Sequence, residues 1–298
     1  MPELSVLLPA RNAEATIGRA VSSTLRAMPR DAELVVLDDG STDGTLRVLE
    51  RLGTDARLRV LHAGSDGGRG VGFALERLRL ETDSRYIARM DADDISLPWR
   101  FSATTPMLRS ADLVFATIVK LHGRRPALGL PLPISTEAFG FHLLLTNPAC
   151  HPTLIASREI LERVGGYRQV PSEDYDLWLR CASDGGRLAR VGTHALVYRV
   201  HPGQVTASAA WLSASWTDDR QAQAFADLSE RLVGKRLRRL VHIAASAREG
   251  ELDRELGEFE AAMAPAIGGI NGVQGRFLRQ RLQARLRWAR QRGMESQK

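Results

Sequence analysis

Three carboxylates stand within four residues at Asp91-Ala92-Asp93-Asp94, directly after an apolar run. Carboxylates this close repel one another, and burial raises their pKa values unless a cation compensates the charge. A divalent ion held by carboxylate and diphosphate oxygens would compensate it, and Mg²⁺ and Mn²⁺ both suit all-oxygen sites. The alternative is an acidic first turn of a helix after Pro98, where negative charge is favourable without a metal.

Two further groups of carboxylates allow two interpretations. Asp38-Asp39 ends an apolar run and either hydrogen-bonds a nucleobase or ribose, or forms a turn before a helix. Glu173-Asp174-Tyr175-Asp176 opens a predicted helix, where negative charges interact favourably with the positive end of the helix dipole. A carboxylate near an acceptor hydroxyl would instead serve as a general base.

Basic side chains offer weaker signals. Arg69 lies in the glycine-rich run 67–72, which resembles a phosphate-binding loop but lacks its Gly-Lys-Ser/Thr ending. His151 and His201 are each followed by proline, and either could be a packed residue or a ligand.

The chemistry-bearing segments follow predicted strands. Apolar runs at 4–8, 34–37, 58–61 and 86–90 predict strands, and helical spacing of apolar residues from Ile17 to Met28 predicts an amphipathic helix. This alternation implies a mostly parallel sheet that is covered on both faces. Ligands of such sheets bind at the carboxyl ends of the strands, where 9–12, 38–41 and 91–94 fall.

The second half of the chain is more mixed. We expect strands at 113–119, 153–155 and 195–200, helices at 159–164 and 174–182, and a loop at 122–135 that is rich in proline and glycine. From residue 208 the pattern is helical. The sequence therefore predicts an α/β domain at 1–207 and a helical C-terminal region at 208–298.

Composition is ordinary for a soluble globular protein, with 44% hydrophobic and 26% charged residues. No apolar run reaches the roughly 18 residues of a membrane span, and the N-terminus lacks signal-peptide features, so we expect a cytoplasmic protein. The tail is a basic amphipathic helix, which either lies on the inner membrane face or packs on its own domain or a second copy. Nucleic-acid binding is not expected, because the segment has little aromatic stacking surface. Its basic residues are Arg276, Arg279, Arg281, Arg285, Arg287, Arg290 and Arg292.

Taken in order, these segments resemble the family-2 glycosyltransferases with the GT-A fold, especially bacterial members that build surface polysaccharides. The resemblance covers residues 4–203. It rests on the motifs at 5–12, 37–45, 86–94, 147–148, 151–153, 165–167, 173–180 and 198–201.

The resemblance implies a role for particular residues. Asp39 would pair with the base, commonly uracil, with Pro9 and Arg11 in the same pocket, and Asp91 would contact the ribose. Asp93 would bind Mn²⁺ or Mg²⁺ at the diphosphate, with His201 as a further metal contact. Asp174 would deprotonate the acceptor hydroxyl, which gives inversion at the anomeric carbon. Secondary candidates are Asp38, Arg69, Asp94, His151 and Glu173.

The expected function is transfer of a sugar from a nucleotide-diphosphate donor, with a UDP-sugar favoured, to a glycan or lipid-linked acceptor. One alternative is a sugar nucleotidyltransferase, which would carry a Gly-rich loop where Pro9-Ala10-Arg11-Asn12 stands. The other is a catalytically silent scaffold of a polysaccharide assembly complex, against which intact Asp93 and Asp174 argue. Gly68, Glu76 and 100–103 depart from the family's common residues.

Overall fold

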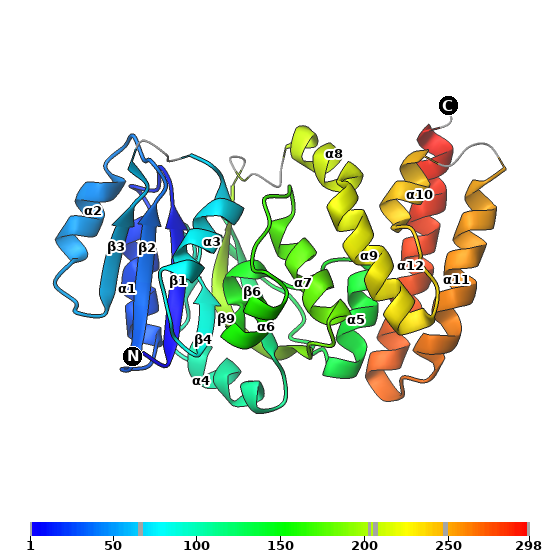
Figure 1. The fold of residues 1–298 in the computed structure, drawn as a ribbon, viewed down its shortest axis with the longest axis horizontal. Coiled ribbons are helices and arrows are strands. Elements are labelled where there is room, and N and C mark those ends of the chain that lie inside the picture. The colour runs from blue at the N-terminus through cyan, green and yellow to red at the C-terminus, as the bar shows by residue number, and fades with distance from the viewer. Residues whose placement is uncertain (1, 65–67, 202–203, 205–207, 247–249, 297–298) are drawn as a thin grey trace. The chain divides into compact units, whose positions relative to one another are not determined.

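The computed structural model describes residues 2–64, 68–201, 204, 208–246 and 250–296 (Figure 1). The chain divides into two compact units that alternate along the sequence. The first comprises 1–133, 149–169 and 187–204, and the second comprises 134–148, 170–186 and 205–298. The domain boundary predicted at residue 207 stays a prediction.

The first unit contains the sheet, whose strand order is β3-β2-β1-β4-β8-β6-β9-β5, with β7 paired to β6. Strands β3, β2, β1 and β4 are mutually parallel (Figure 1), as is the pair β6 and β9, whereas β8, β7 and β5 run antiparallel to their neighbours. The predicted class, a Rossmann-like α/β sheet with C-terminal helices, is confirmed. The strands are β1 (Leu4–Ala10), β2 (Ala32–Asp38), β3 (Leu58–His62), β4 (Tyr86–Arg89), β5 (Ile95–Ser96), β6 (Leu113–His122), β7 (Arg125–Leu128), β8 (Ile155–Ser157) and β9 (Leu188–Val200).

Central strand β1 is buried on both faces, since Val6, Leu7 and Leu8 have no exposed surface. This is why its sequence is a continuous apolar run and not an alternating one. The helices of this unit are α1 (Ile17–Ala27), α2 (Thr45–Leu52), α3 (Val71–Leu80), α4 (Arg100–Thr104) and α6 (Arg158–Arg163).

Two predictions for this unit need correction. The predicted loop 122–135 contains β7, which pairs with the end of β6. All four residues of β7 are exposed, so the strand has no apolar face that a sequence pattern would reveal. The predicted strand 153–155 begins two residues too early, because His151–Thr153 form a 3₁₀ turn before β8.

The second unit is helical. Its helices are α5 (Thr136–Leu145), α7 (Glu173–Ser183), α8 (Ala209–Thr217), α9 (Asp219–Val233), α10 (Leu240–Ser246), α11 (Leu252–Gly268) and α12 (Gly272–Ser296). The sequence pattern did not predict α5. Seven of its residues are buried, from Ala138 to Leu145, so it lacks the polar face on which helical periodicity depends.

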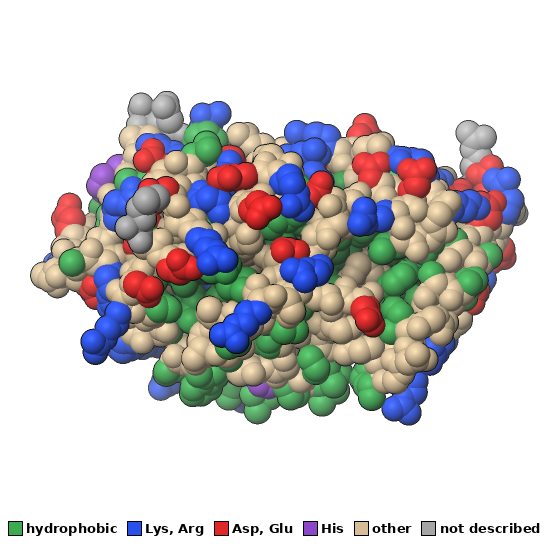
Figure 2. Space-filling view, turned by 60° about the horizontal axis from the view of Figure 1, so that its bottom comes forward, with side chains coloured by type: hydrophobic (Ala, Val, Ile, Leu, Met, Phe, Trp, Pro, Cys, Tyr) green, Lys and Arg blue, Asp and Glu red, His purple; other side chains and the backbone are tan. Residues whose placement is uncertain are grey.

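Helix α12 holds the chain's positive excess. It carries seven arginines and one glutamate, an excess of six charges that equals the net charge of +6 for the whole chain. On the face drawn in Figure 2, basic and acidic side chains are interspersed. Leu278, Leu282, Leu286 and Ala289 are buried where α12 packs on α10 and α11. The apolar side of this tail therefore packs within its own unit.

Within the described residues, no helix has the length and hydrophobicity that a membrane span needs.

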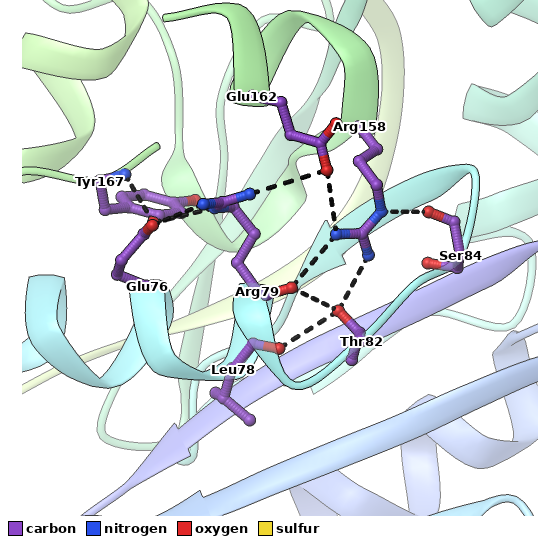
Figure 3. A network of polar contacts seen from close by, with 8 residues as sticks. All are labelled: Glu76, Leu78, Arg79, Thr82, Ser84, Arg158, Glu162 and Tyr167. Carbon is purple, nitrogen blue, oxygen red and sulfur yellow. Dashed lines mark hydrogen bonds and ion pairs between the residues drawn. The ribbon is translucent and has the colours of Figure 1, made fainter. Parts of the chain in front are cut away.

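A polar network joins α3 to α6 (Figure 3). The Glu76 carboxylate accepts two hydrogen bonds from Arg79, at 2.6 and 2.9 Å, and a third from the Tyr167 backbone N–H at 2.9 Å. The hydrogen bonds to Glu76 raise the pKa of Arg79. Arg158 of α6 donates to the Ser84 carbonyl and to the Thr82 hydroxyl, after the end of α3. The network fixes the turn that leads into Tyr167.

Glu76→Ala should destabilise the protein by about 1–3 kcal/mol, because it removes the carboxylate that accepts hydrogen bonds from the Arg79 guanidinium and the Tyr167 N–H. Urea denaturation measures the change. Glu162→Ala is the matched control, since Glu162 is 55% exposed and contacts the same arginines only at 3.8–3.9 Å. Its loss should cost about 0.5 kcal/mol or less. Equal effects of the two variants would contradict the network's role.

Candidate active site

The three predicted segments do meet at one edge of the sheet. Strand β1 pairs in parallel with both β2 and β4, so the carboxyl ends of all three strands lie together. The Asp39 N–H donates to the Ala10 carbonyl at 2.8 Å, and the Met90 N–H donates to the Leu7 carbonyl at 2.9 Å. Pro9 lies half-buried on this edge, opposite Leu37 in β2.

Asp39 and Arg11 both lie next to Gly68. The Asp39 Oδ1 accepts a hydrogen bond from the Gly68 N–H at 2.9 Å. Gly68 has a φ of 82°, and a Cβ there would lie 2.9 Å from the Arg11 guanidinium. Only glycine fits this position without strain. The predicted nucleotide-side residues Asp39 and Arg11 are therefore brought together around one loop.

The two secondary candidates on this side have local partners. The Asp38 Oδ2 accepts from the Ser41 N–H at 3.2 Å, while its buried Oδ1 makes no hydrogen bond with the described residues. Arg69 is exposed, with its guanidinium 3.9 Å from the centroid of the Phe73 ring at the start of α3. Asp38 thus shapes the turn after β2.

The acidic cluster follows β4. Asp91, Asp93 and Asp94 each place a carboxylate oxygen within 4.8 Å of the others. Asp94 is 1% exposed, and burial, followed by the charges of Asp91 and Asp93, raises its pKa to about 9. Its Oδ1 accepts from the Arg199 N–H at 2.9 Å, and its Oδ2 has no partner among the described residues. The cluster is thus a crowded set of hard oxygen donors.

Two neighbouring side chains contact the carboxylates of Asp91 and Asp93. Arg89 lies 2.8 Å from the Asp91 carboxylate, and His201 Nε2 lies 3.0 Å from Asp93 Oδ2. Asp93 and His201, the two predicted metal contacts, therefore lie side by side, and both side chains are partly exposed. Arg89 was not predicted, although its position two residues before Asp91 was a usable signal.

A second unpredicted residue is Arg100, which has no exposed surface. Its guanidinium donates to the Arg89 carbonyl at 2.5 Å, and burial lowers its pKa to about 10 against the opposing effect of Asp94 and Asp91. Arg100 therefore supplies positive charge from beneath the acidic cluster. It begins the short helix α4, and nothing in its sequence position indicated burial.

His151 has a packing partner. Its Nε2 lies 2.9 Å from the Tyr167 hydroxyl, and the two rings are tilted with centroids 5.5 Å apart. His151 is 6% exposed. Tyr167 is the residue whose N–H the Glu76 carboxylate holds, so His151 continues the network of Figure 3.

In the second unit, the first turn of α7 separates its carboxylates by environment. Asp176 is fully buried and pairs with Arg180 at 2.8 Å, and Glu173 is 8% exposed. Asp174 is half-buried, and its Oδ2 accepts from the Asn147 side-chain amide at 3.0 Å. Of these three, Asp174 is the carboxylate that combines solvent access with a fixed orientation.

Comparison with known proteins gives the same class. The sequence model of Glycosyl transferase family 2 matches residues 5–164. EpsE of Bacillus subtilis is 29% identical over 199 residues, which cover 62% of this chain and 69% of EpsE. WfaP of Escherichia coli, a UDP-Glc:alpha-D-GlcNAc-diphosphoundecaprenol beta-1,3-glucosyltransferase, is 27% identical over 220 residues, or 70% of this chain and 81% of WfaP.

The fold agrees. Staphylococcus aureus TarS 1–349 in complex with UDP-GlcNAc has a TM-score of 0.63 at 17% identity and covers 100% of this chain and 89% of that one. The sheet and its acidic edge thus define an enzyme of the glycosyltransferase class with the GT-A fold. The chain belongs to glycosyl transferase family 2, as its motifs predicted.

Asp39→Ala should weaken the binding of UDP by about 1–3 kcal/mol, the scale of lost hydrogen bonds in a buried site. Isothermal titration calorimetry measures the change. Asp31→Ala is the matched control, because Asp31 is exposed just before the opposite end of the same strand. Equal affinity of the Asp39 variant and the wild type would refute the nucleotide role of Asp39.

Proposed function

We propose that the enzyme transfers a sugar, with inversion, from a UDP-sugar to a hydroxyl acceptor with the help of Mn²⁺ or Mg²⁺. One observation carries the proposal. The Asp91–Asp93–Asp94 cluster and the Arg11–Asp39 pair lie at the same carboxyl edge of the sheet in a family-2 glycosyltransferase.

The donor set fits a hard divalent cation. Three carboxylates stand within 4.8 Å, and the buried Asp94 Oδ2 has no partner among the described residues. Asp93 and His201 would hold the ion, with Asp91 toward the ribose. When bound, such an ion stabilises the charge of the departing nucleoside diphosphate. Asp94, held by the Arg199 N–H, would support the cluster from the protein side.

The nucleoside would be held by Asp39 and Arg11. Asp39 Oδ1 is committed to the Gly68 N–H, and its second oxygen would accept the N–H of the base. Arg11, in contact with Gly68, would donate to a carbonyl of the same ring. Uracil offers one N–H between two carbonyls, so its edge matches a carboxylate acceptor (Asp39) beside a guanidinium donor (Arg11).

Asp174 would act as the general base. The acceptor oxygen bonds to the anomeric carbon while the bond from that carbon to the diphosphate oxygen breaks. The hydroxyl proton passes to the Asp174 carboxylate, and the electron pair of the broken bond leaves on the nucleoside diphosphate. Attack opposite the leaving group inverts the anomeric centre. Asn147, at 3.0 Å, would keep the carboxylate aimed.

The names of relatives support the substrate class. WfaP is named for a UDP-Glc donor and a diphosphoundecaprenol-linked acceptor, and the TarS structure holds UDP-GlcNAc. A UDP-sugar donor and a glycan or lipid-linked acceptor in bacterial polysaccharide synthesis are therefore proposed here. We also propose that the protein is cytoplasmic. The arginine face of α12 would then contact either the inner membrane face or a second copy of the chain.

Asp93→Asn should remove the metal-dependent part of donor binding without lowering the stability of the ligand-free protein, because it relieves carboxylate repulsion. A thermal-shift series with UDP, with and without Mn²⁺ and chelator, measures both effects. If Mn²⁺ raised the melting temperature of the UDP-bound variant as much as that of the wild type, the metal assignment would be wrong. A wild-type preference for guanosine or thymidine diphosphate over UDP would refute the donor nucleotide alone.

Asp174→Asn should leave UDP affinity unchanged and lower turnover by about 10²-fold or more, the usual scale for a lost general base. Steady-state transfer assays and UDP titrations measure the two quantities. Asp176→Asn is the contrasting variant. It takes the charged partner from the buried Arg180 and should lower the melting temperature, which Asp174→Asn should not. Normal turnover of the Asp174 variant would rule out the base assignment.

A further inference from the structure

The C-terminal helices contain a buried polar side chain that the proposed chemistry does not use. Gln221, in the first turn of α9, has no exposed surface. Its Nε2 donates to the Ser172 carbonyl at 3.2 Å, and its Oε1 accepts from the Arg239 guanidinium. The side-chain amide therefore links the residue before α10 to the residue before α7.

Arg239 completes the link. Its Nη1 also donates to the Ser215 carbonyl at 2.9 Å, and its guanidinium carbon lies 5.2 Å from the centroid of the Tyr175 ring. Arg239 forms no ion pair with a carboxylate in the described part of the chain. A half-buried guanidinium whose acceptors are neutral is costly to keep for packing alone.

The contacts bracket Asp174. Ser172 is the N-cap residue of α7, but its hydroxyl caps no N–H, and its carbonyl receives both the Asp176 N–H and the Gln221 amide. On the other side, the Tyr175 hydroxyl donates to the Leu143 carbonyl at 2.6 Å, beneath Arg239. The backbone two residues before and one residue after Asp174 is thus held by α5 and the C-terminal helices.

We propose that Gln221 and Arg239 are positioning residues that fix the direction of the Asp174 carboxylate through Ser172 and Tyr175. The inference rests on the proposed role of Asp174 as the general base. It assigns the C-terminal helices a part in turnover, although they do not carry the reacting groups.

The chemistry of the link requires a side-chain amide at 221. A guanidinium can only donate and a carbonyl can only accept, so the bridging group must accept on one side and donate on the other. An ionised glutamate has the same shape but only accepts. Gln221→Glu would keep the bond to Arg239, now as an ion pair, and would turn an oxygen against the Ser172 carbonyl.

Gln221→Glu should therefore lower kcat by about 10- to 100-fold, the scale of a misaligned reacting group. The KM for donor and the affinity for UDP should not change, and the melting temperature should stay near wild type because the ion pair with Arg239 offsets the lost bond. Gln223→Glu is the matched control, since Gln223 is exposed on the same helix and bonds only Asp227. It should keep wild-type kcat.

Gln221→Met separates geometry from charge, because it breaks both bonds without adding a carboxylate. It should lower kcat across the whole pH profile. If Gln221→Glu fails to fold, Arg239→Lys gives the test, with a smaller loss of kcat expected at unchanged donor KM.

A double-variant comparison identifies the route. If Gln221 acts through Asp174, then Gln221→Glu should have almost no further effect on kcat in the Asp174→Asn background. The same fold loss in both backgrounds, or wild-type kcat in the single variant, overturns the inference. Normal turnover of Asp174→Asn would instead show that the proposed base is wrong, which keeps the two failures distinct.

Discussion

The repulsion among Asp91, Asp93 and Asp94 is the constraint on which the donor side depends. Three carboxylates lie within 4.8 Å at the end of a buried strand, and burial, followed by the charges of Asp91 and Asp93, raises the pKa of Asp94 to about 9. The protein offsets this with the charges of Arg89 and of the fully buried Arg100, and the His201 ring contacts Asp93 at 3.0 Å. These partners come from β4, from the segment after β9 and from α4. The sheet topology is therefore what makes a site of high negative charge tolerable.

The second unit treats a similar run of carboxylates differently. In α7 the charge of Asp176 is neutralised by Arg180 within one turn, so its burial costs little beyond the pair itself. Asp174 keeps solvent access and accepts from Asn147. Side chains two positions apart in one helix can thus have different roles, because Asp176 pairs with Arg180 within α7 whereas Asp174 accepts from Asn147 in the segment after α5.

The departures from common family residues have local physical reasons. Gly68 allows the Arg11 guanidinium to approach the backbone at a positive φ. Glu76 holds Arg79 and the Tyr167 N–H, which makes it part of the structural network and explains a charged residue at this position (Figure 3). Arg100 lies under the acidic cluster, where its charge counters the carboxylates. These substitutions follow the protein's own packing and charge balance.

The amino-acid sequence is enough to predict the parallel strands of the sheet and the edge on which Asp39 and Asp93 both lie. Local patterns are enough there, because buried strands are continuous apolar runs and parallel strands align their carboxyl ends. The tertiary structure alone decided which partners those residues have. Arg100 and Gln221 are polar residues that sequence patterns assign to the surface, and only the packing of distant elements buries them. Helix α5 and strand β7 were not predictable for the same reason: one is buried on nearly every side and the other is exposed throughout, so neither carries the alternation that reveals an element.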